Sequence, residues 1–240
     1  MEDITVVGVV LSAMPYREKD KLIHIFSVEL GKVTAILKGV SSPSSKLKFA
    51  GQPFCFAKFE LTGSKDFYTV KGAELIDTFF DITNDYNVYS LALSMLEISS
   101  VILKPNIIAE NMFLCLIKTL QNIVYNNIDP KLSILKFYLS VLKMIGYELN
   151  FETCDNCSMK FLGDIKFSMD TGTFRCTACG GIKIEKVDFM TLKILSNTPI
   201  ERLNTIKLTT RSIDNSIKLI LNNLSNKLNY KIKSVDLNLI

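Results

Sequence analysis

The feature that most constrains this chain is a set of four cysteines arranged in two C-x-x-C pairs. Cys154 and Cys157 form the first pair, eighteen residues follow, and Cys176 and Cys179 form the second. Each pair can turn two sulfurs towards one point, and two pairs supply the four thiolates of a tetrahedral zinc site. The spacing is typical of such sites. We therefore predict that these four cysteines bind one zinc ion per chain.

The residues between the pairs predict a β-hairpin, as a zinc ribbon needs. Residues 165–169 and 173–175 flank the turn-prone Asp170-Thr171-Gly172. Two alternatives use the same cysteines: a pair of redox or disulfide sites, and unligated core cysteines. A disulfide framework suits a small secreted chain, which one of 240 residues is not. Because four cysteines leave no open position for substrate, the predicted zinc is structural.

The first 80 residues alternate short apolar runs with turn residues, which predicts strands. The runs are Ile4–Leu11, Lys21–Ser27, Lys32–Lys38, Phe54–Leu61 and Tyr68–Glu74. Five short strands at this spacing indicate a small closed or partly closed barrel. The first strand is expected to end at Ser12-Ala13-Met14-Pro15, and residues 39–53 are expected to form a flexible basic loop.

From residue 86 the apolar positions recur with helical spacing. Helices are predicted over residues 86–102, 108–124, 130–145, 187–195 and 212–228, the last capped by Thr209 or Thr210. Short connections suggest that the first three pack as a bundle. The fold class is therefore α+β. The predicted domains are residues 1–80 and a helical domain over 81–240, which residues 151–181 interrupt as the ribbon.

The composition of the chain and the positions of its basic residues limit the classes of function that it can have. Hydrophobic residues make up 48% and charged residues 22%, as in a globular protein with a core. No run approaches the roughly 18 apolar residues of a membrane span, and the start lacks the basic residues of a secretory signal, so we expect a cytoplasmic protein. Two basic zones, residues 32–59 and 202–233, suit nucleic acid; solvated charged faces are the alternative.

No pattern of catalytic residues stands out. The single histidine, His24, lies in a predicted apolar strand, where a structural role is expected. Gly31-Lys32-Val33 lacks the preceding glycine and the hydroxyl of a phosphate-binding loop. No GxGxxG, HExxH or GxSxG sequence occurs either. We therefore expect a protein that is neither an enzyme nor an ATPase.

Several segments in order resemble RecO proteins, a family of bacterial recombination mediators. The resembling pieces are residues 8–22, 29–33, 37–40 and 51–54, then Leu135-Lys136-Phe137, Leu142, Gly146-Tyr147, the first cysteine pair, and residues 228–239 with Lys233-Ser234. They cover nearly the whole chain. The resemblance implies an oligonucleotide-binding (OB) barrel at the amino terminus, followed by a helical domain with an embedded zinc ribbon.

The resemblance also implies a function in recombinational DNA repair. RecO proteins bind single- and double-stranded DNA, anneal complementary strands without ATP, and act with RecR. They engage the acidic C-terminal tail of the single-strand-binding protein and help the RecA recombinase to load. A cytoplasmic, nucleoid-associated protein would follow. The rival classes are an adaptor whose barrel binds protein, and a nuclease or other metal enzyme, which the closed cysteine site disfavours.

Basic residues of the barrel and its loop are the predicted phosphate contacts. They are Arg17, Lys19, Lys21, Lys32, Lys38, Lys46 and Lys48. The family often carries a basic cluster after Lys38-Gly39, whereas this chain continues with Val40 and serines, which would weaken the barrel's affinity for phosphate. For each lysine the alternative is plain solubility. Four aromatic residues are instead expected in the barrel core: Phe49, Phe54, Phe56 and Tyr68.

One further residue is predicted to meet the partner tail. An acidic peptide with an apolar end needs a hydrophobic groove with a cation at its rim. Lys136, Ser140 and Lys143 recur along one side of the helix predicted over 130–145. Because Lys136 also lies in the segment that resembles the family, we predict that it borders the groove for the tail. The alternative is a solvated lysine on an amphipathic helix.

Overall fold

The computed structural model describes residues 2–64, 67–105 and 107–236. Contacts within the chain divide it into two compact units, residues 1–120 and 121–240. The predicted domain boundary after residue 80 stays a prediction. Among the described helices, none has the length and apolar character needed to cross a membrane.

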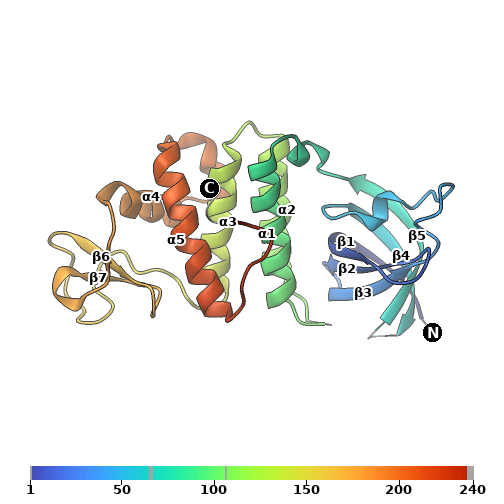
Figure 1. Cartoon of the computed structure of the whole chain (residues 1–240), viewed down its shortest axis with the longest axis horizontal. Helices are drawn as coiled ribbons and strands as arrows, with labels where there is room; N and C mark the ends of the chain where they lie inside the picture. Colours follow the sequence, from blue (N-terminus) through green and yellow to red (C-terminus); the bar gives the residue numbers. More distant parts are fainter. Residues whose placement is uncertain (1, 65–66, 106, 237–240) are drawn as a thin grey trace. The chain divides into compact units, whose positions relative to one another are not determined.

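The first unit contains a closed barrel of five strands, drawn in blue to cyan in Figure 1. The strands are β1 (Glu2–Pro15), β2 (Lys21–Ser27), β3 (Gly31–Leu37), β4 (Phe56–Ser64) and β5 (Phe67–Asp77). Their order around the barrel is β1-β2-β3-β5-β4, and β1 pairs with β4 to close it. Only β3 and β5 pair in parallel. The sheet fits an OB-like fold, which confirms the predicted barrel.

Alternation along the strands separates the barrel core from its outer face. On β2, Ile23 and Ile25 are fully buried in the core. Leu22 and His24, which alternate with them along the strand, are partly exposed. The same alternation runs along β3 from Gly31 to Ala35, whereas Ile36 and Leu37 are both buried. Successive side chains of a strand point to opposite faces of a sheet. Leu22, His24, Lys32, Thr34 and Ile36 therefore lie on the outer face.

Two segments of the barrel differ from the prediction. β1 does not end after Leu11 but continues to Pro15, because a register shift between Val10 and Ser12 lets its last residues pair with β2. The connection 39–53 is not a free loop. Val40 and Ala50 are buried in the barrel core, and a short 3-10 helix, η1 (Phe49–Gly51), forms within it. The apolar residues among its serines and lysines hold it in place.

The predicted core aromatics divide into two groups. Phe54 and Tyr68 are buried as expected, and Phe49 packs partly against the core. Phe56 lies outside the barrel core and stacks on Phe79, with ring centroids 6.5 Å apart. Its ring and that of Phe26 also meet Phe113, so the barrel wall packs against the helices of the first unit.

Those helices follow the barrel directly in the chain. They are η2 (Phe80–Asn84), α1 (Tyr86–Ile102) and α2 (Glu110–Val124), which crosses the division between the units. Asp85 caps α1 by accepting hydrogen bonds from the backbone N–H groups of Asn87 and Val88. Lys32 joins β3 to α1, since its ammonium donates to the Ser100 carbonyl at 2.6 Å.

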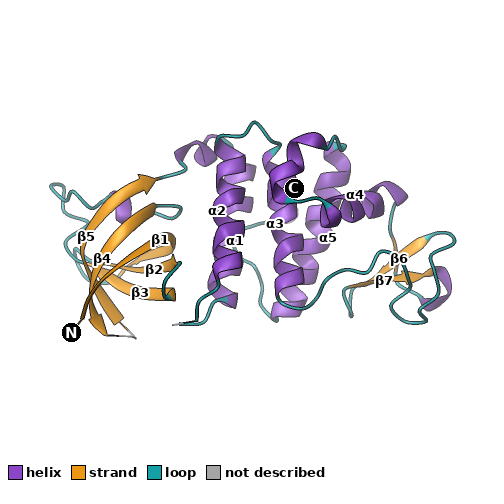
Figure 2. Ribbon diagram, turned by 180° about the vertical axis from the view of Figure 1, so that it is seen from behind, coloured by secondary structure: helices purple, strands orange, loops and turns teal. Residues whose placement is uncertain are grey.

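The second unit combines helices with the ribbon, as Figure 2 shows in purple and orange. Its helices are α3 (Pro130–Met144), α4 (Lys186–Asn197), η4 (Ile200–Thr205) and α5 (Thr210–Leu228). α3 packs against α4 and α5. Both partners come later in the chain than α3. The predicted bundle of the first three long helices stays a prediction. Thr209 caps α5, one of the two predicted caps.

The ribbon is a small sheet of order β7-β6-β8, formed by β6 (Ile165–Ser168), β7 (Thr173–Cys176) and β8 (Ile182–Lys183). β6 and β7 form the predicted hairpin. Three side chains of α5 donate to carbonyls of the hairpin turn: Asn223 to Gly172, Asn226 to Met169 and Lys227 to Thr171. These bonds fix the hairpin to the helices.

Candidate functional site

Four sulfurs converge at one end of the ribbon. The Sγ atoms of Cys154, Cys157, Cys176 and Cys179 all lie within 4.8 Å of one another. Cys157 and Cys176 come from different pairs, and their sulfurs are 3.7 Å apart. A tetrahedron with Zn–S bonds of about 2.3 Å has sulfur–sulfur edges of about 3.8 Å. The four thiols can therefore hold one metal ion, and their spacing and chemistry fit zinc.

Local backbone geometry turns each pair inward. After the first pair, Ser158 adopts a positive φ of 61° and donates its N–H to the Cys154 carbonyl at 2.8 Å. After the second pair, Gly180 has a φ of 79°. Both turns reverse the chain within a few residues, so the two sulfurs of each pair face the same point. We call residues 154–158 and 176–180 the two knuckles.

The environment of the thiols favours cation binding. Burial opposes ionisation of Cys154, but backbone N–H groups, that of Cys176 first, outweigh it and lower the pKa of the thiol to about 6. The Met159 N–H lowers the pKa of Cys157, yet the neighbouring thiols, that of Cys154 first, raise it to about 12. Of these two thiols, that of Cys154 therefore ionises more readily. A divalent cation would favour ionisation of the others.

The predicted phosphate contacts differ in how their charged groups are placed. Five of the side chains are exposed: Arg17, Lys19, Lys38, Lys46 and Lys48. The ammonium of Lys48 donates to the Pro43 carbonyl at 2.8 Å. Lys21 is partly buried and donates to the Gly51 carbonyl at 2.9 Å. Two of the six lysines, Lys21 and Lys48, therefore brace connection 39–53.

Four of these residues gather where β1 passes into β2. The Ser41 N–H donates to the Lys19 carbonyl at 3.0 Å, so the β1–β2 connection lies against the start of connection 39–53. Lys21 pairs with Leu37, which places Lys38 beside the same turn. We call Arg17, Lys19, Lys21 and Lys38 the basic end of the barrel.

Lys32 lies apart from this group. It opens β3 and pairs with Phe26, at the far end of β2 from Lys21. Its ammonium is bound to the Ser100 carbonyl, and burial lowers its pKa. Lys32 therefore has a structural partner within the first unit, a role that its sequence position did not reveal.

Lys136 also differs from its expected setting. The side chain is buried, and its ammonium donates to the carbonyls of Leu195 at 2.8 Å and Ser196 at 3.1 Å, in the last turn of α4. A cation at a helix C-terminus is stabilising. Lys143, expected on the same side of the helix, is exposed and pairs with Glu148. The alternative of a solvated Lys136 is therefore wrong, because α4 packs onto α3 at this residue. The predicted groove beside Lys136 stays a prediction.

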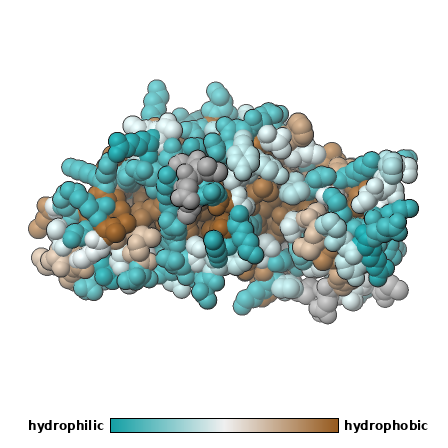
Figure 3. Space-filling model, viewed as in Figure 1, coloured by the Kyte–Doolittle hydropathy of each residue, from teal (hydrophilic) through white to brown (hydrophobic). Residues whose placement is uncertain are grey.

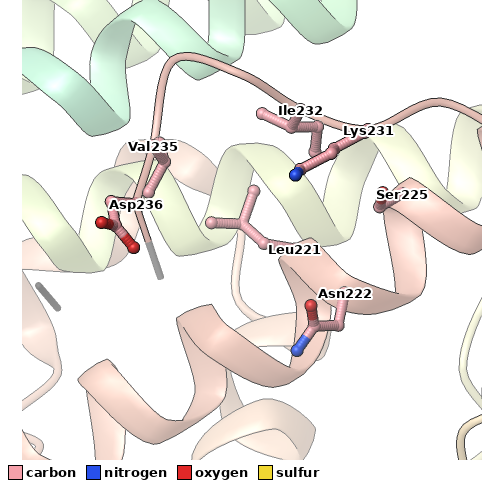
Figure 4. A pocket seen from close by; sticks show the side chains of 7 residues that line it. All are labelled: Leu221, Asn222, Ser225, Lys231, Ile232, Val235 and Asp236. Atoms are coloured by element: carbon pink, nitrogen blue, oxygen red, sulfur yellow. The ribbon is translucent and has the colours of Figure 1, made fainter. Parts of the chain in front are cut away.

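Two of the cavities lined by described residues lie in the second unit. The smaller one, of about 280 Å³, separates α5 from the chain segment 231–236 (Figure 4). Leu221, Ile232 and Val235 line it from the two sides. Residues 237–239, the end of the segment that resembles the RecO carboxy terminus, lie outside the described residues. The cavity is the space left where segment 231–236 packs against α5.

The larger cavity is an open groove between the ribbon and α4, of about 980 Å³. Phe161, Leu162 and Met190 give it an apolar lining, and exposed Lys160 and Lys186 stand at its edge. Figure 3 shows apolar side chains at the surface in this region, on the left. This groove combines an apolar lining with four lysines and three carboxylates, and two of the lysines, Lys183 and Lys193, form ion pairs with Asp164 and Glu152.

Two exposed aromatic residues of the barrel were not among the predicted site residues. Tyr16 and Phe67 are 44% and 40% exposed, and their ring centroids are 6.5 Å apart. Tyr16 directly follows β1 and Phe67 begins β5, and an aromatic residue at the end of a strand is the signal that could have marked them. Their pairing depends on the closure of the barrel and is not visible in the sequence.

Comparison with known proteins covers both parts of the chain. Residues 1–79 match the family "Recombination protein O N terminal", and residues 83–236 match "Recombination protein O C terminal". The chain is 29% identical to the DNA repair protein RecO of Clostridium novyi (strain NT) over 214 residues, 88% of this chain and 82% of that protein. It is 27% identical to that of Caldicellulosiruptor bescii over 223 residues, 92% of this chain and 91% of that protein. This chain therefore belongs to the RecO family of DNA repair and recombination proteins.

Proposed function

We propose that this RecO-family chain is a DNA-binding recombination mediator that acts without catalysis. It would anneal complementary strands without ATP and, with RecR, help RecA to load on DNA covered by single-strand-binding protein. The repair role rests on relatives named DNA repair protein RecO. The observation that carries DNA binding is the basic end of an OB-like barrel, because barrels of this kind bind oligonucleotides through such loops.

Annealing without a cofactor needs only charge and access. Two complementary strands repel each other through their phosphates, and exposed side chains such as Arg17, Lys19 and Lys38 would neutralise part of that charge. The contacts would be to phosphates, so binding would not depend on base sequence. Annealing by this mechanism would not require the chain to make or break a covalent bond.

Zinc would serve this function indirectly. The four cysteines fill a tetrahedral shell, so a bound zinc ion would have no open position for water or substrate. When bound, the ion would cross-link the two knuckles and stabilise the ribbon beside α4. We propose one such structural zinc ion per chain.

Reversing charge at the barrel is expected to weaken DNA binding and to flatten its salt dependence. Replacing Lys38, Lys46 and Lys48 together by Glu would remove up to three phosphate contacts. Each lost contact lowers the slope of log K against log salt by about 0.7 on single strands. Fluorescence anisotropy with a labelled oligonucleotide at several salt concentrations measures both quantities.

The matched control is a single charge reversal elsewhere in the same unit. Lys104 is exposed and follows α1, away from the basic end, so Lys104→Glu should change binding less than Lys38→Glu. An unchanged salt slope in the triple variant would exclude connection 39–53 from the DNA surface. Strand annealing followed by fluorescence, with and without single-strand-binding protein, then tests the mediator role itself.

The acidic tail of single-strand-binding protein is the second proposed partner. The prediction that Lys136 borders its groove requires the ammonium to leave two backbone carbonyls. The groove between the ribbon and α4 already offers an apolar lining with exposed Lys160 and Lys186. Both places are proposals, and they make different predictions.

Anisotropy with a labelled tail peptide separates the two places. If the tail binds beside α4, Lys160→Glu and Lys186→Glu weaken peptide binding, while Lys143→Glu, a control on α3, does not. If it binds beside Lys136, Lys136→Glu weakens binding in protein that remains folded. Because Lys136 holds two carbonyls, unfolding by urea is measured alongside, and a loss of about 1–3 kcal/mol is expected. Wild-type peptide affinity in folded Lys136→Glu protein at low salt would place the groove elsewhere.

A further inference from the structure

We propose that Tyr16 and Phe67 form a stacking step for unpaired bases on the outside of the barrel. The step would give the barrel a preference for single-stranded over double-stranded DNA. This inference rests on the proposed DNA-binding function and adds a base-contacting site to it. The rings of Tyr16 and Phe67 would contact the bases. The cations proposed above, including Arg17, would contact the phosphates.

The two rings form one surface although they come from different parts of the barrel. Tyr16 directly follows the last residue of β1, and Phe67 is the first residue of β5. Their planes are inclined by 52° and their centroids are 6.5 Å apart. Each residue is about two-fifths exposed, at 44% and 40%. Large aromatic rings dominate the energetics of cores and interfaces, so an exposed pair suggests a binding partner.

The place of the pair on the barrel favours an oligonucleotide. OB barrels bind oligonucleotides on the face of strands 2 and 3 and with the loops that join strands 1–2 and 4–5. Tyr16 lies in the β1–β2 connection, and Phe67 directly follows the β4–β5 connection. Leu22, partly exposed on the outer face of β2, continues the apolar surface, and Met14, which pairs with it, is 44% exposed.

The charges around the pair suit a polyanion. The Arg17 guanidinium lies over the Tyr16 ring, 5.3 Å from its centroid. β2 and β3 contain no acidic residue. Two acids lie in the β1–β2 connection: Glu18 is exposed, and Asp20 accepts a hydrogen bond from the Gly39 N–H at 2.8 Å. Among the described residues of the basic end, Arg17, Lys19, Lys21 and Lys38 outnumber these two acids.

Stacking explains why the step would discriminate between strands. Each base has a flat π-face that an aromatic ring can cover, so stacking tolerates any sequence. In a duplex both faces of each base are already covered by its neighbours, and only the phosphates remain available. Cations alone bind both forms of DNA, whereas the aromatic step would add affinity only for the unpaired form.

The test separates bases from phosphates. Tyr16→Ala/Phe67→Ala is compared with wild type on three labelled ligands of about 16 nucleotides: oligothymidylate, an abasic strand of equal length, and a duplex. We expect about 10- to 100-fold weaker binding to oligothymidylate. Binding to the abasic strand and the duplex, and the salt slope, should not change, because the phosphate contacts remain.

Matched variants control for folding and for lost aromatic area. Phe80→Ala/Tyr86→Ala removes the same two residue types from exposed positions of the first unit, 69% and 71% exposed, and should bind as wild type does. Tyr16→Phe/Phe67→Tyr keeps both rings and should retain the preference. Equal melting temperatures of the two alanine variants and wild type establish that the folds are intact.

The outcomes distinguish this inference from the proposed function. If wild type binds all three ligands and the Tyr16→Ala/Phe67→Ala variant binds oligothymidylate equally well, the stacking step is wrong while DNA binding stands; the rings would then face a protein. A parallel loss on the abasic strand also overturns it, because that ligand has no bases. If wild type binds none of the three, the proposed function fails and the step fails with it.

Discussion

Removal of the proposed zinc ion is expected to unfold the two knuckles while leaving the barrel folded. Apparent binding free energies of structural zinc are about 10–16 kcal/mol, as large as the stability of a whole domain. Without the ion, the knuckles keep local backbone turns, such as that from the Ser158 N–H to the Cys154 carbonyl, and one bond from the Asp155 N–H to the Phe174 carbonyl. Hydrogen exchange during titration with a chelator, with elemental analysis of zinc, measures the effect.

The loss of protection is expected to be graded along the ribbon. Residues 154–158 and 176–180 should exchange fastest, whereas turn 169–172 should keep more protection because α5 binds three of its carbonyls. The buried rings of Phe167 and Phe174, 5.2 Å apart, add a local core.

Cysteine variants provide the control for zinc removal. Cys154→Ser should lower the zinc content to well below one ion per chain, since it removes one of four ligands. Cys55→Ala changes a thiol buried in the barrel, away from the knuckles, and should keep the full zinc content. Protein purified without added metal that contains almost no zinc but has a protected ribbon would contradict the structural role.

Gly172→Ala is expected to destabilise the second unit by about 3 kcal/mol. Gly172 has a φ of 64°, and an alanine there costs about 1–2 kcal/mol. A Cβ would also overlap with the side-chain amide oxygen of Asn223, whose amide nitrogen donates to the Gly172 carbonyl. Displacing that buried amide costs about 1–3 kcal/mol more. Unfolding by urea, followed by circular dichroism, measures the difference.

A second background separates the two contributions. In Asn223→Ala protein the overlap is absent, so Gly172→Ala should cost only its backbone conformation, about 1–2 kcal/mol. Gly146→Ala is a control for the backbone alone: its φ is 86°, and nothing lies within 4 Å of the position of its Cβ. If Gly172→Ala costs the same in both backgrounds, contact with Asn223 does not explain the effect.

Local patterns determined the elements and the metal ligands. The spacing of Cys154, Cys157, Cys176 and Cys179 is set by the backbone turns inside each pair, so the sequence was sufficient to bring out the group that can hold a metal ion. Alternating apolar residues likewise predicted five strands, and helical spacing predicted the long helices. Each of these signals extends over a few residues, the range at which sequence and conformation are directly linked.

Only the tertiary structure decided what each charged or aromatic side chain contacts. Lys136 looks like a surface lysine along its own helix, but α4 brings two carbonyls onto it from residues 195 and 196. Tyr16 and Phe67 meet only because the barrel closes. Such contacts join residues far apart in the sequence, and their partners are chosen by packing and chain topology. The residues next to a side chain in the sequence therefore do not predict these contacts.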